Sequence, residues 1–387
     1  MSTQRQTTAV AVAGPAGVTE RTFAHHGAAA SARLAWFTDG LARMMSEAGY
    51  DARPEPGPDV QVVLHVVDLA RPRPYRRRNA PTFVVAIAEV DQPPDDLLRT
   101  GYPVLVRGLA NLAVLVSTND TERAAHFVTL EQGTSTVRHT GSDDAFFGEV
   151  FGRVEPLASS RLVIANDIRP DLPPELWGGD DQTRQLEQGG ERLDRLNLLP
   201  APFPIEELLS ERDLRHVKLL YGIGGLSYGN LSARRQPPTT SEYGPEFWMS
   251  ASGVDKATLH RVGRDVLLVR GYDPERDAMV LSVPPDMEPN RVSVDAIEHW
   301  MIYREHPEVG AIVHVHAWID GTVATDISYP CGTLELADAV AGLVRAAPDA
   351  ARAIVGQRNH GLTITGPDLD DIFERIEGRV VPHVPMD

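Results

Sequence analysis

The sequence predicts an α/β protein with two domains, each built around its own sheet. Short apolar runs typical of strands alternate with longer segments in which apolar residues repeat at helical spacing. The 387 residues are enough to form two hydrophobic cores. Residues 168–202 are rich in Pro, Gly and charged residues, as domain boundaries often are. We therefore expect a disordered tail over 1–21, an N-terminal α/β domain over 22–167, a linker over 168–202 and a separate C-terminal domain over 203–387.

The N-terminal domain is predicted from one helix, a series of strand-like runs and a second helix. The first helix ends at Gly49. Strands are then expected at VQVVLHVVDL (60–69), TFVVAIAEV (82–90), PVLVRGL (103–109), LAVLVS (112–117) and HFVTLEQ (126–132). A helix at 143–158 and a strand, RLVIANDI (161–168), complete the domain. His65 lies inside an apolar strand and is interpreted as a core histidine, and we find no catalytic motif in this domain.

The C-terminal domain also mixes helices with strands. We expect helices at 204–223, 293–307, 332–347 and 368–380, and strands at 246–259, 265–273, 278–283, 310–317 and 353–366. Helices bound most of these strands, and some strands follow one another as hairpin-like pairs. The pattern therefore favours an α/β sandwich around a mixed or antiparallel sheet.

Composition argues against several classes of function. The formal charge of −17 repels polyanions, so nucleic acid is not an expected partner. No stretch approaches the ~18 uninterrupted apolar residues of a membrane span, so no membrane partner is expected. The single cysteine, Cys331, cannot form an internal disulfide, which fits a reducing cytoplasm. The basic cluster RPRPYRRR (71–78) is interpreted as a solvated loop, with a local anion site as the alternative.

A candidate metal site begins with the motif HVHAW, which contains His314 and His316. Side chains two residues apart on a strand point to the same face. A third histidine, His360, stands beside a glycine in QRNHG. Three neutral imidazoles leave open positions on a divalent metal, as catalysis requires. Asp295 and Glu298 could share one helix face and supply a carboxylate for proton transfer. Spacing alone leaves metal binding and plain packing both open.

Two further segments carry polar groups suited to a substrate. Ser252 and Gly253 follow a strand and precede an expected helix, with Lys256 close behind, so they could form an anion cradle or simply cap that helix. In YGIGGLSYGNLS a helix precedes the glycines and a strand follows, which is the reverse of the dinucleotide-binding arrangement. A tight turn before Asn230 leaves its amide able to act as a donor.

Taken in order, the segments GNLSARR, SASGVDKATL, SVDAIEHW, HVHAW and NHG resemble the class II aldolase/adducin family, over about residues 203–387. The family includes fuculose-phosphate and rhamnulose-phosphate aldolases and ribulose-phosphate 4-epimerase, and its adducin branch is structural. The resemblance implies an α/β/α sandwich around a central, mainly antiparallel sheet. It also implies zinc binding by His314, His316 and His360, because the family's aldolases bind zinc with such histidines and adducins lack them.

The same resemblance suggests residues for proton transfer and for substrate binding. Asp295 stands where the family's aldolases carry a catalytic Glu, so it is expected to take or return the proton. The residues Asn230, Ser252, Gly253 and Ser293 are expected to bind a phosphate or another anionic group. The family pattern has two serines before the acid, and this sequence has Ser293 alone, so a substrate without phosphate is also open.

The predicted function is that of a metal-dependent aldolase. Such a lyase breaks or forms a carbon–carbon bond in a small hydroxy-ketone or sugar-phosphate-like substrate by stabilising an enediolate. Zinc is the expected cofactor. Three alternatives remain open: an oxygenase of the same fold with non-heme iron in secondary metabolism, a sugar-phosphate epimerase, and a non-enzymatic binding protein whose metal is structural. We expect a cytoplasmic homo-oligomer with a small-molecule substrate.

Overall fold

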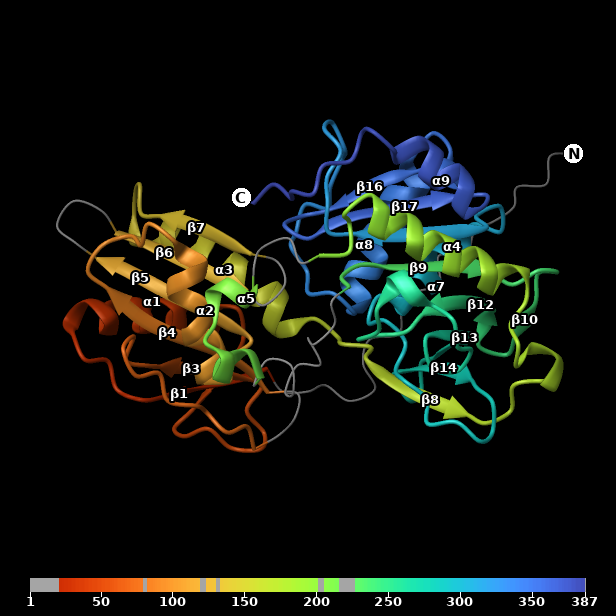
Figure 1. Ribbon diagram of the computed structural model, residues 1–387. Helices are drawn as coiled ribbons and strands as arrows, with labels where there is room; N and C mark the ends of the chain where they lie inside the picture. The colour runs from red at the N-terminus through yellow and green to blue at the C-terminus, as the bar shows by residue number, and fades with distance from the viewer. Residues whose placement is uncertain are drawn as a thin grey trace, which may run out of the picture.

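The computed structural model shows two domains that lie side by side (Figure 1). It describes residues 21–78, 82–118, 123–129, 133–200, 205–215 and 227–386. The tail expected over residues 1–21 lies outside these ranges except for Arg21, and so do residues 204 and 216–223 of the helix expected over 204–223. Within the described ranges, no helix combines the length and the apolar character needed to cross a membrane.

A seven-stranded sheet forms the centre of the N-terminal domain, in the order β2-β1-β3-β4-β5-β6-β7. Its strands are β1 (Thr22–His26), β2 (Asp51–Arg53), β3 (Val62–Val66), β4 (Phe83–Val90), β5 (Leu112–Thr118), β6 (Arg123–Thr129) and β7 (Thr134–Arg138). The strands from β2 to β5 pair in parallel, and β6 and β7 add antiparallel pairs at one edge. Strands β3, β4 and β5 are buried along most of their length, as parallel strands covered on both faces must be.

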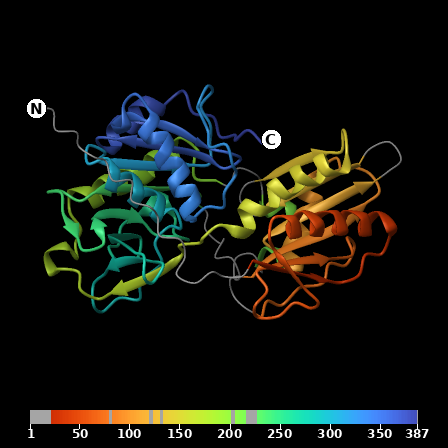
Figure 2. The same cartoon turned by 180° about the vertical axis from the view of Figure 1, so that it is seen from behind.

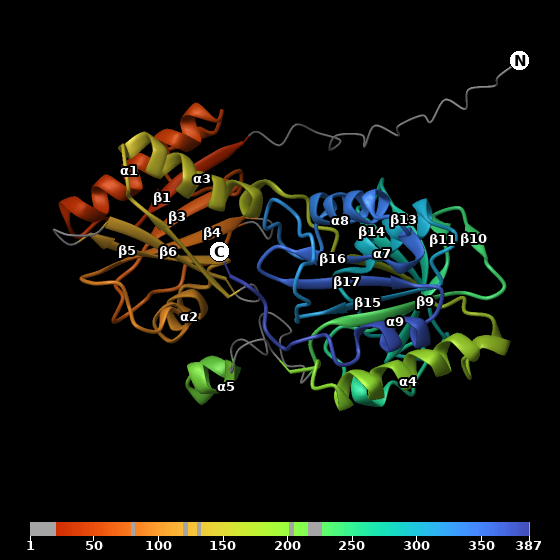
Figure 3. The same ribbon diagram turned by 90° about the horizontal axis from the view of Figure 1, so that it is seen from above.

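Helices cover both faces of this sheet: α1 (Ala32–Glu47), α2 (Leu97–Gly108) and α3 (Asp143–Ser159). Helices α1 and α3 lie together on one face, and α2 lies on the opposite face (Figures 2 and 3). Each helix is capped at its N-terminus by a side chain that accepts a hydrogen bond from a backbone N–H of the first turn. The capping residues are Ser31 for α1, Asp96 for α2 and Ser142 for α3. The N-terminal domain is therefore a three-layer α/β/α unit.

One strand expected in this domain is wrong. The run PVLVRGL (103–109) belongs to α2, which contains Pro103 in its interior. Four consecutive apolar residues suit a buried helix as well as a strand, so the run itself is ambiguous. The side chain of Asp96 caps this helix by accepting the backbone N–H of Arg99, and the buried Gly101 and Tyr102 directly precede the run within the same helix. Strands β1, β2 and β7 were not expected from the sequence, and β1 lies at the start of the segment in which the first helix was expected.

The C-terminal domain is built on an eight-stranded sheet in the order β16-β17-β15-β9-β12-β13-β14-β8. Its strands are β8 (Ala165–Arg169), β9 (Asn230–Arg234), β12 (Phe247–Ser250), β13 (Val266–Asp273), β14 (Ala278–Ser282), β15 (Ala311–Val315), β16 (Ile354–Gln357) and β17 (Gly361–Gly366). Neighbours from β16 to β14 pair antiparallel, while the edge strand β8 pairs in parallel with β14. The mainly antiparallel sheet confirms the predicted fold of this domain.

Helices enclose this second sheet as well: α4 (Asp181–Arg195), α7 (Ala296–Glu305), α8 (Leu334–Ala346) and α9 (Leu369–Ile376). Helices α7 and α8 lie on one face, and α4 and α9 on the other (Figure 3). A separate hydrophobic cluster fills each of the two interfaces. The shorter elements are α5 (Ile205–Leu208), the pair β10 (Thr240–Ser241) and β11 (Gly244–Pro245), and 3-10 turns at Pro174–Leu176, Lys256–Thr258 and Ala350–Arg352.

The chain crosses between the domains more often than a simple linker would require. Strand β8, expected as part of the N-terminal domain, pairs with β14 and satisfies the edge of the C-terminal sheet. Helix α4, within the expected linker, packs its buried Leu186 and Leu193 into the C-terminal core. The chain then returns, because Ile205 and Leu208 of α5 pack against α2 in the N-terminal core. We still propose domain boundaries at 168 and 202. In addition, β8 and α4 pack with the C-terminal domain, and α5 packs with the N-terminal domain.

Candidate metal centre

Strand β15 positions two of the three expected ligands. It lies in the interior of the sheet, between β9 and β17. Its residues Val313 and Val315 pack into the cluster on the side of α4 and α9. The alternate residues Ile312, His314 and His316 therefore point towards the opposite face, which α7 covers. Strand alternation, which the sequence predicts, thus directs both imidazoles to one side.

His360 comes from a tight turn between β16 and β17, in a stretch that we expected to be a single strand. Asn359 adopts a left-handed conformation with φ of 60°, which asparagine tolerates better than most residues. The His360 N–H donates to the carbonyl of Gln357 at 3.0 Å. Gly361 then passes so close to β15 that a Cβ would stand 2.2 Å from the carbonyl oxygen of Val315. The sequence Asn-His-Gly therefore brings an imidazole up against β15.

The three imidazole rings form a nearly equilateral triangle. Ring centroids lie 5.0 Å apart for His314 and His316, 4.8 Å for His314 and His360, and 4.7 Å for His316 and His360. One nitrogen from each ring lies within 4.8 Å of the other two, and all three side chains are buried. Two Zn–N bonds of about 2.1 Å span at most about 4.2 Å. Small ring movements would therefore let all three nitrogens share one ion.

Each ring of this triangle has a buried nitrogen without a hydrogen-bond partner among the described residues. These atoms are Nε2 of His314, Nδ1 of His316 and Nδ1 of His360. The other nitrogen of His314, Nδ1, lies 3.0 Å from the Leu362 carbonyl, so it carries the proton and leaves a lone pair on Nε2. Buried polar atoms are nearly always hydrogen-bonded. Each of the three rings thus keeps a nitrogen that no described residue uses, which suits a group of imidazoles that binds a metal.

Burial keeps the three imidazoles neutral. It lowers the pKa of His314, where the charge of Asp295 opposes it. Burial lowers the pKa of His316 and the pKa of His360 well below the ordinary value, and the neighbouring imidazoles add to the effect. Neutral imidazole is the form that coordinates a metal. A cation can therefore bind near neutral pH without first displacing protons from these rings.

Asp295 lies at the N-terminus of α7, and 5% of it is exposed. Its Oδ2 accepts a hydrogen bond of 2.6 Å from the Asn230 amide, while its Oδ1 has no partner within the described ranges. The charge of Asp295 acts on His314, Lys256 and Glu298, so it stands beside the triangle. The Asn230 amide, which we expected to face an anion, is directed to this carboxylate instead.

Glu298 lies on the same helix as Asp295 but is held differently. Its Oε1 accepts from the Thr363 hydroxyl at 2.5 Å, and its Oε2 accepts from the Gln357 amide at 2.9 Å. Burial, reinforced by Asp295, raises the pKa of Glu298 well above the ordinary value. Gln357 also lies 3.3 Å from Nδ1 of His314. Both carboxylate oxygens of Glu298 are therefore hydrogen-bonded, whereas Asp295 keeps one oxygen without a partner within the described ranges.

Lys256 is buried in the structure. The sequence suggested only that it lies close to a possible anion cradle. The expected helix around it is a short 3-10 turn, in which Lys256 is 3% exposed and its Nζ donates to the Ser227 carbonyl at 2.8 Å. Burial lowers the pKa of Lys256 to about 8, against the opposing charges of Asp295 and Asp255. A Cβ at Gly190 would stand 1.9 Å from the Lys256 carbonyl oxygen, so α4 packs closely against this turn. The Gly-Gly pair in α4 is the sequence feature that could have indicated this close packing.

The expected anion-binding residues Ser252, Gly253 and Ser293 lie on two loops that run side by side. The Ser252 N–H donates to the Arg291 carbonyl at 2.8 Å, which joins the loops. Ser252 and Ser293 are half-buried and Gly253 is exposed, so all three are accessible to solvent. Ser293 precedes Asp295 by two residues, so one of the paired loops leads directly into the segment that carries this carboxylate.

A family model matches part of the C-terminal domain. Residues 215–326 match the class II aldolase and adducin N-terminal domain, which confirms the resemblance for the C-terminal region of the chain. The matched residues include Asp295, His314 and His316, whereas His360 lies beyond them. Among the curated proteins, none matches the chain.

Two solved structures are also similar to part of the chain. L-fuculose 1-phosphate aldolase is 17% identical with a TM-score of 0.33, over 51% of this chain and 81% of that chain. An aldolase II superfamily protein from Pseudomonas syringae is 14% identical with a TM-score of 0.34, over 53% of this chain and 73% of that chain. At TM-scores this low, neither likeness supports an activity for this chain.

Proposed function

We propose that the C-terminal domain is a metal-dependent lyase that breaks or forms a carbon–carbon bond in a small hydroxy-ketone or sugar-phosphate-like substrate. The observation that carries the proposal is the triangle of His314, His316 and His360, whose buried nitrogens lack partners among the described residues. The family match over residues 215–326 supports the same class of chemistry.

The set of possible ligands favours zinc. Catalytic zinc sites use three protein ligands, often histidines, and leave the fourth position to water or substrate. Many iron oxygenases instead combine two histidines with one carboxylate. Asp295 is not part of the cluster of possible ligand atoms, which argues against that arrangement. An oxygenase that binds iron with the same three histidines would be separated from a zinc lyase by the metal and the activity. When bound, the cation would act as a Lewis acid on a substrate carbonyl and so stabilise the negative charge that develops when the neighbouring bond breaks.

Asp295 would move the proton. Its Oδ1 has no partner within the described ranges, and the Asn230 amide holds the carboxylate in place through Oδ2. In the cleavage direction, Oδ1 accepts the proton of the hydroxyl that becomes the aldehyde, and in the reverse direction it returns that proton. Lys256 adds positive charge to a site where negative charge develops on the substrate.

The anionic end of the substrate would lie on the paired loops. Ser252 and Ser293 offer hydroxyl groups there, and Gly253 lets a ligand approach the backbone closely. Asn230 would act through Asp295 rather than on the anion. The proposal also includes a homo-oligomer and a cytoplasmic location. Sedimentation of the purified protein tests the oligomeric state.

Assays of the protein loaded with different metals test this function. The zinc-loaded protein should condense dihydroxyacetone phosphate with short aldehydes and cleave the products, and the metal-free protein should do neither. Consumption of dioxygen by the iron-loaded protein would favour an oxygenase. Inversion of one sugar-phosphate carbon without net cleavage would favour an epimerase. A protein that binds no zinc or iron and shows none of these activities would contradict the proposal and favour a non-enzymatic binding role.

A further inference from the structure

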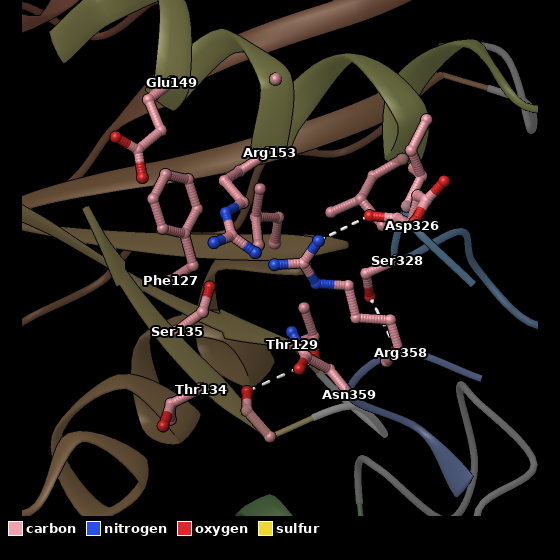
Figure 4. Close-up of a pocket in the computed structure, with 15 residues that line it drawn as sticks. Phe127, Thr129, Thr134, Ser135, Glu149, Arg153, Asp326, Ser328, Arg358 and Asn359 are labelled. Atoms are coloured by element: carbon pink, nitrogen blue, oxygen red, sulfur yellow. Dashed lines mark hydrogen bonds between the residues drawn. The ribbon is translucent and has the colours of Figure 1, made fainter. Parts of the chain in front are cut away.

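A cavity of about 260 Å³ lies between the two domains. The N-terminal domain contributes residues from β5, β6, β7 and α3, and the C-terminal domain contributes a loop after β15 and the turn between β16 and β17 (Figure 4). This volume is slightly below the ~300 Å³ at which small-molecule sites usually begin. An occupant would therefore be a compact compound of few heavy atoms.

Each domain sends one arginine into this cavity. Arg153 comes from α3, and Arg358 comes from the β16–β17 turn. Figure 4 shows both guanidinium groups directed into the same space. Guanidinium groups match the planar oxygens of carboxylates and the oxygens of phosphates with paired hydrogen bonds. Two of them facing one small cavity favour an anionic occupant.

The remaining polar groups fit an anion that also carries hydroxyl groups. Hydroxyls of Thr134, Ser135 and Ser328 and the amide of Asn359 line the walls. The acidic residues of the lining, Glu149 and Asp326, are exposed, whereas both arginines are half-buried. Solvent and salt therefore screen the negative charges more than the positive ones. The apolar part of the wall is formed by Leu112, Phe127, Leu157 and Ile327.

The turn that borders the cavity is the turn that carries His360. Arg358 and Asn359 line the cavity and directly precede this histidine. The Arg358 N–H donates to the Thr325 hydroxyl at 3.1 Å, and its guanidinium donates to the Asp326 carbonyl, so hydrogen bonds join the turn to the loop after β15. A ligand held by Arg358 would therefore contact the segment that positions one corner of the histidine triangle.

We propose that this cavity binds a small carboxylate or phosphate compound, held between Arg153 of the N-terminal domain and Arg358 of the C-terminal domain. The N-terminal domain thereby acquires a role, because it supplies half of a ligand site next to the metal centre. Binding of the anion in this cavity does not require the metal chemistry proposed above. A failure of one proposal can therefore be told apart from a failure of the other.

Calorimetric titration of the full, metal-free chain with inorganic phosphate, and separately with malonate, tests the proposal. At least one of the two should bind with a roughly millimolar or tighter dissociation constant. Binding of phosphate alone assigns the site to phosphates, and binding of malonate alone assigns it to carboxylates. Arg153→Gln and Arg358→Gln should each weaken that binding about tenfold or more. Arg195→Gln, an exposed arginine in α4, is the control for loss of one positive charge and should leave binding unchanged.

A blocking variant makes the test independent of the arginines. Gly152 lines the cavity from α3, and a Cβ there would meet no atom within 4 Å, so Gly152→Leu can extend into the cavity without straining the helix. Gly148→Leu is the matched control, because Gly148 lies one turn earlier in α3, is equally open and does not line the cavity. Gly152→Leu should abolish binding and Gly148→Leu should not. Absence of binding by both probes, or equal binding by Gly152→Leu and the native chain, would overturn the proposal.

Discussion

Each domain contains a cluster of histidines at the ends of neighbouring strands, and the two clusters differ in how their ring nitrogens are used. In the N-terminal domain, the rings of His26 and His65 have centroids 4.8 Å apart. Their Nδ1 atoms lie 2.9 Å from each other, and Nε2 of His65 lies 2.7 Å from the Arg73 carbonyl. In the C-terminal triangle the centroid distances are similar, 4.7–5.0 Å, but each ring has a buried nitrogen without a partner among the described residues.

The comparison shows that closeness of rings does not identify a metal site. Both clusters bring imidazoles to within 5.0 Å of each other, centroid to centroid. In the N-terminal cluster the protein itself satisfies both ring nitrogens of His65, as expected for a core histidine. In the C-terminal cluster each ring keeps a buried nitrogen that has no hydrogen-bond partner among the described residues. The hydrogen-bond partners, rather than the distances, separate a packed cluster from a binding site.

The largest effect is expected from removing a histidine of the C-terminal triangle, with removal of a histidine from the N-terminal pair as the comparison. His316→Ala should lower zinc affinity by more than the 10–100-fold that changes around a ligand usually cost, because it removes a ligand itself. His65→Ala should leave zinc binding unchanged, although it leaves a void in the N-terminal core. Elemental analysis and zinc titration of both purified variants, with far-UV circular dichroism as the check on folding, measure this. Stoichiometric zinc in His316→Ala would contradict the ligand assignment.

The next effect concerns the acid beside the triangle. Asp295→Asn should reduce the rate of carbon–carbon bond cleavage by about 10²–10⁴-fold, the usual contribution of a positioned general acid or base. Because Asp295 is not among the possible ligands, zinc binding should persist in this variant. Asp295→Glu restores the acid of the family pattern and should recover part of the rate. Equal activity of the Asn variant and the native protein would remove Asp295 from the mechanism.

A smaller effect is expected from the residues behind the ligands. The Thr363 hydroxyl donates to Glu298, and Glu298 also accepts a hydrogen bond from the Gln357 amide, which lies beside His314. Thr363→Val removes this hydroxyl and should weaken zinc binding about tenfold. Thr365→Val is the matched control on the same strand. Both threonines are fully buried and hydrogen-bonded, but Thr365 bonds to backbone atoms of 350–353 instead. Zinc titration should separate the two variants, and equal affinities would show that the network acts on stability alone.

The smallest effect is a dependence of stability on pH. Burial lowers the pKa of His299 to about 3, so the unfolded chain takes up a proton before the folded chain does, and stability falls as the pH drops below about 6.5. His314, His316 and His360 contribute in the same direction. The raised pKa of Glu298 has the opposite sign, because there the folded chain holds the extra proton.

A variant isolates the contribution of His299. In metal-free protein, His299→Asn should reduce the slope of unfolding free energy against pH by about 1.4 kcal/mol per pH unit between pH 6 and pH 4, since one fewer proton is taken up on unfolding. His383→Asn, which alters an exposed histidine, is the control. Urea unfolding at several pH values measures both slopes. Parallel slopes for His299→Asn and the native chain would show that His299 is not held neutral by burial.

Much of the fold could be predicted from local patterns. The alternation along β15 and the apolar runs of β3 and β4 identify buried strands, because side chains alternate strictly along an extended chain. The exceptions come from segments whose pattern suits two structures. PVLVRGL is helical within α2, residues 353–366 fold back as a hairpin, and residues 165–169 join the sheet of the other domain. Pairing between distant segments decides each of these.

The sequence by itself determined that His314 and His316 share one face of a strand, because that relation depends on two neighbouring residues and the geometry of an extended backbone. It also indicated the helix that carries Asp295. Only the tertiary structure decided that His360 completes the triangle and that Asp295 keeps an oxygen without a partner within the described ranges. Only the tertiary structure placed two arginines of different domains around one cavity. The physical reason is that local periodicity specifies the direction of a side chain, whereas its neighbours follow from the register between strands and the packing of whole layers.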